Sequence, residues 1–199
     1  MKYPEVIQNL IDNFASLPGI GQKTAERLVF YLLKSRDEKS LQEFGQNLSQ
    51  IKAIIKVCPQ CGDYKENDHC QICDDVKREK NKICVVAEAQ DILYLDKTGS
   101  YKGLYHILGG LLSPALGVTI DKLKVNELLK RMDGVEEIIF GFNPTVEGET
   151  TIIYLKKIIK EKYPKIKTTR LSRGLPMGGD LEYADEITLA NAIDNRSEV

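Results

Sequence analysis

The sequence predicts an α/β protein: a helical N-terminal domain, a small four-cysteine finger, a mostly parallel sheet with flanking helices, and a short helical tail. Three observations lead to this prediction. Apolar residues recur at helical spacing through the first 56 residues, two C-x-x-C pairs follow, and β-branched runs alternate with amphipathic segments from residue 83 onward. Such alternation is typical of parallel strands joined by crossover helices.

The composition is that of an ordinary folded protein. Of 199 residues, 42% are hydrophobic and 29% are charged, and the net charge is −1. No apolar run approaches the ~20 residues of a transmembrane helix, and no signal-peptide pattern is present, so we expect a cytoplasmic protein without a membrane span. Because the chain is nearly neutral, any nucleic-acid surface must be local. Changes of pattern predict domains over residues 1–57, 58–80, 81–176 and 177–199.

The N-terminal domain is predicted to form a small bundle of three helices, over residues 4–16, 22–34 and 38–56. The first two are separated by the turn L-P-G-I-G, in which the glycines allow the backbone to reverse tightly. This helix–turn–helix arrangement resembles the helix-hairpin-helix of DNA-repair proteins.

The same turn predicts a phosphate-binding surface. Gly19 and Gly21 leave the backbone amides at the start of the second helix facing outward, where they can bind a phosphate. Lys23 and Arg27 lie one helical turn apart and can flank the same DNA backbone. Such contacts bind phosphates without reading the base sequence. The alternative is a tight turn between two core helices that carry solvated charges.

The strongest single signal is a pair of C-x-x-C motifs separated by eight residues. Two such pairs complete a tetrahedral thiolate site, and four protein ligands leave no open position, so we expect structural rather than catalytic Zn²⁺. A reducing compartment also favours metal binding over disulfides. Cys84, within a predicted strand, is expected to be a buried, inert thiol. The predicted ligands are Cys58, Cys61, Cys70 and Cys73.

The rest of the chain alternates between strands and helices. Strands are predicted over residues 83–87, 104–108, 135–140 and 166–170. Helices are predicted over residues 89–95, 121–132, 151–162 and 184–193. Ligand sites of open parallel sheets lie at the carboxyl ends of the strands, so we expect binding or catalytic residues just after these strands.

Acidic residues follow two of the predicted strands. Glu88 comes directly after the first strand, and the polar loop G-F-N-P-T-V-E-G-E, which carries Glu147 and Glu149, follows the third. Hard cations such as Mg²⁺ prefer several carboxylate oxygens. The pattern therefore indicates magnesium chemistry at this edge of the sheet.

A glutamate at one strand end and an acidic loop at another resembles the Toprim domain of topoisomerases, primases and related nucleases. In that family the loop commonly reads D-x-D followed by E-G. Here Asn143 and Thr145 stand at the two aspartate positions. An amide and a hydroxyl bind divalent metal weakly, so the comparison predicts a retained scaffold with at most a weak Mg²⁺ site.

Residues 150–175 contain eight Lys or Arg side chains and one acid. This basic run begins in the predicted helix 151–162 and continues beyond it. A solvated helix face is the usual interpretation of such lysines. A second DNA-facing strip is the alternative.

The order of these motifs, closed by L-P-M-G-G-D-L-E-Y, resembles the bacterial RecR family of recombination mediators along essentially the whole chain. The resemblance implies a non-enzymatic role in recombinational DNA repair, with RecO and in some settings RecF, that helps RecA to load onto single-stranded DNA at gaps. It also implies weak binding to single- and double-stranded DNA, and assembly as dimers or ring-like tetramers. The implied partner or weak-metal surface comprises Glu88, Asn143, Glu147 and Glu149.

Two other functions are compatible with the sequence. A magnesium-dependent Toprim nuclease or primase-like enzyme would use Glu88, Glu147 and Glu149 as its metal ligands. A zinc-stabilised interaction module would make no DNA contact, and neutralising Lys23 and Arg27 would distinguish it from a DNA binder. Nucleotide hydrolysis is poorly supported, because the chain contains no G-x-x-x-x-G-K-[ST] motif.

Overall fold

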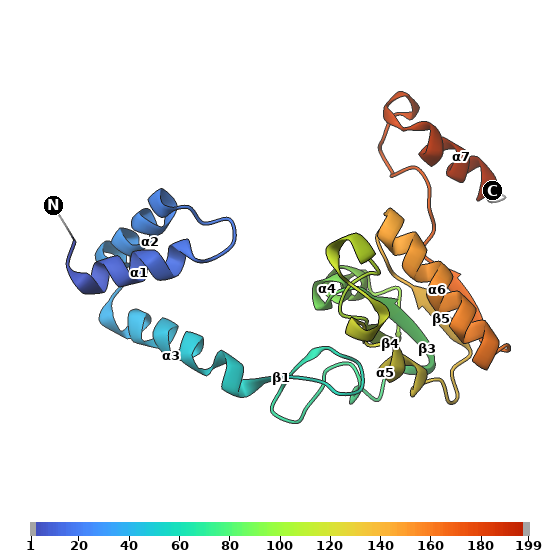
Figure 1. Cartoon of the computed structure of the whole chain (residues 1–199), viewed down its shortest axis with the longest axis horizontal. Coiled ribbons are helices and arrows are strands. Elements are labelled where there is room, and N and C mark those ends of the chain that lie inside the picture. Colours follow the sequence, from blue (N-terminus) through green and yellow to red (C-terminus); the bar gives the residue numbers. More distant parts are fainter. Residues whose placement is uncertain (1–2, 197–199) are drawn as a thin grey trace. The chain divides into compact units, whose positions relative to one another are not determined.

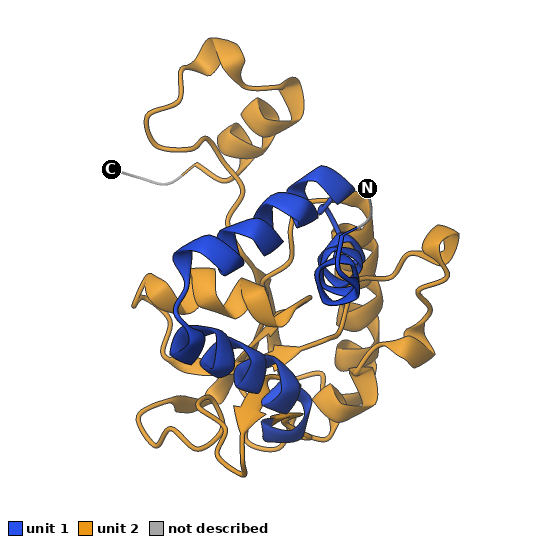
Figure 2. Cartoon of the chain, turned by 90° about the vertical axis from the view of Figure 1, so that its left-hand side faces the viewer, with its two compact units in different colours: residues 1–54 blue, residues 55–199 orange. Residues whose placement is uncertain are grey.

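The computed structural model describes residues 3–196 and divides the chain into two compact units, residues 1–54 and 55–199 (Figure 2). Within the second unit, the boundaries expected for the finger, the sheet domain and the tail stay predictions. In the part of the chain that the structure describes, no helix is long and apolar enough to cross a membrane.

The first unit contains three helices, α1 (Glu5–Ala15), α2 (Gln22–Ser35) and α3 (Glu38–Ile54) (Figure 1). Helices α1 and α2 pack against each other, because their apolar residues recur every three or four positions and form one face each. Their shared core is Ile11, Ala25 and Val29. The expectation of a closed three-helix bundle is wrong for the single chain, since α3 buries none of its residues.

The second unit begins with a hairpin that the sequence did not indicate. Strand β1 (Ile55–Val57) pairs antiparallel with β2 (Tyr64–Glu66). The helix predicted to reach residue 56 therefore ends at Ile54. The β-branched residues Ile55 and Val57 favour a strand once a pairing partner is available, and that partner follows only seven residues later.

A four-stranded parallel sheet forms the centre of the second unit, in the order β4-β3-β5-β6. Strand β3 begins earlier than predicted, within the charged connector, because the backbone amide of Glu79 donates to the carbonyl of Lys102 at 2.8 Å. Pairing with the neighbouring segment makes residues 79–82 part of the strand although they are polar. The strands are β3 (Glu79–Val86), β4 (Gly103–Ile107), β5 (Glu137–Phe140) and β6 (Lys167–Arg170).

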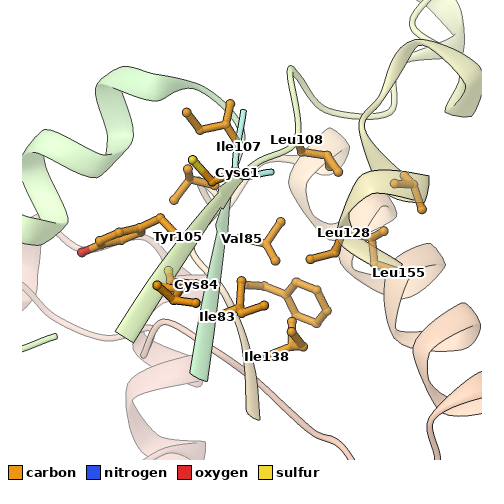
Figure 3. Packing of buried hydrophobic residues seen from close by; sticks show 14 of the residues in the cluster. Cys61, Ile83, Cys84, Val85, Tyr105, Ile107, Leu108, Leu128, Ile138 and Leu155 are labelled. Atoms are coloured by element: carbon orange, nitrogen blue, oxygen red, sulfur yellow. The ribbon is translucent and has the colours of Figure 1, made fainter. Parts of the chain in front are cut away.

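Helices cover both faces of this sheet, as predicted. Alternate residues of β3 point to opposite faces: Val85 points toward Leu128 and Leu155, whereas Cys84 points toward the side of Tyr105 (Figure 3). Leu95 packs on the Cys84 face. The helices that cover the sheet are α4 (Ala89–Lys97), α5 (Val125–Leu129) and α6 (Val146–Lys162). The C-terminal α7 (Glu186–Asp194) adds no residue to this core, and short 3₁₀ turns lie at Pro114–Leu116, Ile120–Lys122 and Leu181–Tyr183.

Two predicted helices of the second unit begin later in the structure than expected. The helix expected over 121–132 is α-helical only in α5, because the chain is extended at Leu123 and the Lys124 amide donates to the Leu108 carbonyl at 2.8 Å. That bond ties the segment to the end of β4. The C-terminal helix starts two residues late, because Asp185 is its N-cap and accepts from the Thr188 amide at 2.9 Å.

Candidate functional site

The four predicted metal ligands converge in the finger. The Sγ atoms of the four cysteines all lie within 4.8 Å of one another. The Cys61–Cys70 sulfur pair is separated by 3.5 Å and the Cys58–Cys73 pair by 4.0 Å. A tetrahedral ion with metal–sulfur bonds of about 2.3 Å places its ligands roughly 3.8 Å apart. The arrangement therefore fits a tetrahedral metal site.

Backbone hydrogen bonds hold the first cysteine pair in a tight knuckle. The Cys58 amide donates to the Asp63 carbonyl at 2.7 Å, and the Gly62 amide donates to the Cys58 carbonyl at 2.9 Å. Gly62 has a φ of +84°, which favours glycine at this position. Burial raises the pKa of the Cys70 thiol to about 11. A bound metal cation would favour the thiolate form of Cys70.

The finger is attached to β4, one of the two edge strands of the sheet. The Ile107 amide donates to the Cys61 carbonyl at 2.7 Å. His106 is fully buried beside this bond, and its Nδ1 accepts from the Arg131 guanidinium at 3.2 Å while its Nε2 donates to the Lys124 carbonyl at 2.9 Å. Burial is the main cause that lowers the pKa of His106 to about 4, so the ring is neutral. The bond between Ile107 and Cys61 thus ties the finger to β4, and the neutral His106 ring packs beside it with both of its nitrogens hydrogen-bonded.

The turn before α2 exposes the amides that the sequence singled out. Gly19 has a φ of +79°, and Gly21 is the N-cap of α2 without any side chain that caps the helix. The first amides of α2 therefore have no side-chain partner and face outward. Lys23 and Arg27 are exposed on the following turn, and neither forms an ion pair with any described residue. This geometry is suited to binding an anion.

The acidic loop is shorter than the sequence indicated. Helix α6 begins at Val146, so Glu147 and Glu149 lie in its first turn rather than in the loop. Thr145 is the N-cap, and its Oγ1 accepts from the Gly148 amide at 3.1 Å. Acids in a first turn are stabilised by the positive end of the helix dipole. The two glutamates therefore have a local structural role that requires no metal.

Glu149 is paired with two arginines. Its carboxylate accepts from Arg170 at 3.1 Å and also forms an ion pair with Arg173. Glu88 lies just after β3 and is the N-cap of α4. Its amide donates to the Asp91 side chain at 2.9 Å. Among residues 3–196, the four cysteines are the only group of potential ligands that comes together to hold a metal. The structure does not gather the three glutamates into such a group.

Three family models cover most of the chain. Residues 7–52 match "RecR, helix-hairpin-helix", residues 81–172 match "Toprim domain", and residues 174–197 match "RecR, C-terminal". "Recombination protein RecR" of Desulfitobacterium hafniense strain Y51 is 43% identical over 199 residues, which is 100% of this chain and 98% of the relative. The protein of the same name from strain DSM 10664 / DCB-2 has the same identity and coverage. This chain belongs to the RecR family.

Membership of the RecR family confirms the resemblance and the fold class that the motifs predicted. The first family model covers most of the helical unit, and the second covers the sheet. The four cysteines lie between these two matches, in the hairpin and the turn that follows it. The third model covers the segment that ends in α7.

Two features of this RecR-family site were missed by sequence reasoning. Arg170 and Arg173 appeared only as members of a basic run, and their pairing with Glu149 depends on β6 lying beside β5. Thr151 carried no signal, yet it is fully buried. Its hydroxyl accepts from the Leu112 amide at 2.9 Å and donates to the Glu147 carbonyl at 2.6 Å. Thr151 thereby joins the loop after β4 to the first turn of α6.

Replacing Thr151 with valine is expected to destabilise the protein by about 1–2 kcal/mol, because the isosteric side chain leaves the buried Leu112 amide without an acceptor. Urea unfolding measures this loss. Thr150→Val is the matched control, since the neighbouring Thr150 is exposed and its hydroxyl bonds only to a carbonyl of its own helix. Equal stability of the two variants would contradict a linking role for Thr151.

Proposed function

We propose that this protein is a non-catalytic, sequence-nonspecific DNA-binding recombination mediator. In this role it acts in recombinational repair with RecO, and in some settings RecF, to promote RecA loading onto single-stranded DNA at gaps. The observation that carries the proposal is the exposed start of α2, which has no side-chain cap and is flanked by two cations without an ion-pair partner among residues 3–196, in a chain similar along its length to proteins named Recombination protein RecR.

DNA binding is assigned to the turn before α2. Amides at a helix N-terminus and the helix dipole both favour an anion, and Gly19 and Gly21 let a phosphate approach the backbone closely. A Cβ at either glycine would meet nothing within 4 Å, so the turn is open to a ligand. Lys23 and Arg27 supply the neutralising charges. These contacts are available to single- and double-stranded DNA, because both present phosphates.

The metal of the finger is proposed to be structural Zn²⁺. Four thiolates satisfy its tetrahedral preference and leave no site for a catalytic water. Two C-x-x-C pairs that hold a metal are typical of proteins in a reducing compartment, and we place this protein in the cytoplasm.

The Toprim glutamates are proposed to act as a partner surface with at most weak Mg²⁺ affinity. Asn143 and Thr145 replace two carboxylates, and Glu149 is neutralised by two guanidinium groups. Glu88 and Glu147 keep their carboxylates free of ion pairs within the described chain. A nuclease or primase-like activity would have to assemble its metal site from groups that are not gathered in this chain.

A homo-oligomer, either a dimer or a ring-like tetramer, is also proposed. Its support is the apolar surface of α3, where large side chains are exposed in the single chain: Phe44 is 43% exposed, Leu48 58% and Ile51 55%. Contiguous apolar surface on a folded unit is typical of protein–protein contacts. A ring would let a nearly neutral protein retain DNA by enclosing it.

The double substitution Lys23→Gln, Arg27→Gln tests the DNA-binding site. Each lost phosphate contact reduces the magnitude of the slope of log affinity against log salt concentration by ~0.9 on duplex DNA. The double variant is therefore expected to have a slope that is smaller in magnitude by about 1.8. At roughly 0.1 M salt this corresponds to at least tenfold weaker binding. Fluorescence anisotropy with a short labelled duplex, repeated across a salt series, measures both quantities.

The matched control is Lys34→Gln, Arg36→Gln, which removes the same charge from exposed positions at the C-terminal end of α2. An unchanged slope in the Lys23, Arg27 variant would refute the phosphate-binding role of the turn. Incubation with supercoiled plasmid and magnesium, followed by deproteinisation, tests the enzymatic alternative. Nicked or linear product that disappears in a Glu147→Ala variant would identify an enzyme.

A further inference from the structure

The basic run of residues 150–175 lies on α6, on β6 and in the segments next to them. Most of its lysines lie on the C-terminal half of α6 and on strand β6, which is one of the two edge strands of the sheet. Six lysines of this run are exposed: Lys156, Lys157, Lys160, Lys162, Lys165 and Lys167. The run lies in the second compact unit, whereas the turn before α2 lies in the first.

Helical geometry places three of these lysines together. Leu155 and Ile159 are buried in the core of the sheet domain and define the inner side of α6. Lys156 and Lys160 lie about 40° apart around the helix axis, on the exposed side. Lys157 lies about 60° beyond Lys160. The three charges therefore share one outward face, which runs along the helix away from the glutamates at its N-terminus.

Few nearby acids neutralise this face. Glu161 is the only acid within the run, and the Glu149 carboxylate already forms ion pairs with Arg170 and Arg173. Lys167 pairs with Glu137 at 3.8 Å, whereas Lys156, Lys157 and Lys160 form no ion pair with any residue that the structure describes. The helix dipole accounts for cations in the last turn of α6, but Lys156 and Lys157 precede that turn.

A groove lies between this helix face and the edge of the sheet. It has a volume of ≈ 380 Å³, and its lining combines apolar, hydroxyl and cationic groups with one carboxylate, that of Glu149, which forms ion pairs with Arg170 and Arg173. Ile153, which is 69% exposed, gives the groove an apolar side. The cationic and hydroxyl groups of the lining belong to Lys156, Thr168, Thr169 and Arg170. Cations and hydroxyls bind phosphates, and apolar side chains accommodate sugars, so the chemistry of the groove matches a nucleic-acid backbone.

We propose that the exposed side of α6 and the adjoining β6 edge form a second DNA-backbone contact. This inference rests on the DNA-binding role proposed above and extends it to the Toprim unit. Two weak contacts on separate units of one chain reinforce each other, since the second forms at the effective concentration set by the linkage. A protein with a net charge of −1 can then bind DNA through two local basic surfaces.

The test is the triple substitution Lys156→Gln, Lys157→Gln, Lys160→Gln, measured by the same anisotropy salt series on the same labelled duplex. Three lost phosphate contacts are expected to reduce the salt slope by about 2.7. The matched control is Lys97→Gln, Lys102→Gln, Lys122→Gln, which makes the same change in net charge at exposed positions elsewhere in the second unit. The control is expected to keep the slope of the wild-type protein.

Two further measurements keep the outcomes distinct. Lys160 is in the last turn of α6, so the double variant Lys156→Gln, Lys157→Gln removes charge without changing that turn. It is expected to reduce the magnitude of the salt slope by about 1.8. Thermal melts establish that each variant is folded. If the triple variant matches its control while Lys23→Gln, Arg27→Gln weakens binding, the second contact is refuted and the proposed function stands. If the wild-type protein binds no DNA, the proposed function itself fails.

Discussion

Replacing Cys61 with alanine is expected to abolish metal binding and unfold the finger. In zinc-finger peptides, structural zinc contributes about 10–16 kcal/mol of folding free energy, which equals or exceeds the total stability of a typical domain. Few other interactions can compensate, because the finger is a short hairpin whose buried side chains are mainly the cysteines themselves and Ile72. Elemental analysis measures the metal per chain, and limited proteolysis shows whether the segment around residues 55–74 becomes accessible.

The destabilisation caused by Cys61→Ala should extend beyond the finger. The Cys61 carbonyl accepts from the Ile107 amide at 2.7 Å, and buried His106 lies beside that bond. An unfolded finger would leave these groups of β4 without their cover, so a decrease in the thermal unfolding temperature of the sheet domain is also expected.

Cys84→Ala is the matched control, because it removes one thiol from the core of β3 rather than from the cluster. Burial raises the pKa of Cys84 to about 12, as expected for an inert thiol. This variant should keep its metal and lose roughly 1 kcal/mol. Full metal content in Cys61→Ala would show that the four-cysteine site is not the metal centre.

The elements that could be predicted from the sequence are those specified by local pattern. The apolar spacing before and after L-P-G-I-G is enough to predict α1 and α2, since each helix presents one face to the other. The spacing of the cysteine pairs is similarly informative, because a metal-binding knuckle is a local structure. The strands of the sheet were also found, since β-branched runs bounded by polar segments are typical of buried parallel strands.

The features that could not be predicted depend on contacts between distant segments. The shortening of α5 follows from the bond between Lys124 and Leu108, and the earlier start of β3 follows from pairing of Glu79 with the segment before β4. Neither partner can be inferred from the local sequence. The neutralisation of Glu149 is of the same kind, because Arg170 reaches it only through the order of strands in the sheet.

The start of α6 was misplaced for a different reason. Thr145 is a good N-cap residue, and acids follow it in the first turn, so a start signal was present in the sequence. Gly148 obscured that signal, because glycine disfavours helix and suggests a loop. The structure shows why glycine stands there: a Cβ at residue 148 would collide with the backbone carbonyl oxygen of Asn143.

Gly148→Ala is therefore expected to destabilise the sheet domain by an amount near the upper end of the ~1–3 kcal/mol typical of overpacking. The Asn143 carbonyl cannot easily move away, because it accepts from the Thr145 amide at 2.8 Å and follows directly after buried Phe142. The added methyl group must instead displace the first turn of α6, and with it Glu147 and the Thr145 cap. Urea unfolding followed by circular dichroism measures the loss.

Gly45→Ala provides a control of opposite sign. Gly45 also lies within a helix, α3, but a Cβ there would meet nothing within 4 Å. Because alanine loses less conformational freedom than glycine on folding, this variant is expected to be more stable by about 0.5–1 kcal/mol. If both variants gained stability, the close approach between Gly148 and the Asn143 carbonyl would not be a real constraint, and the glycine of the N-P-T-V-E-G-E motif would need an explanation in partner binding instead.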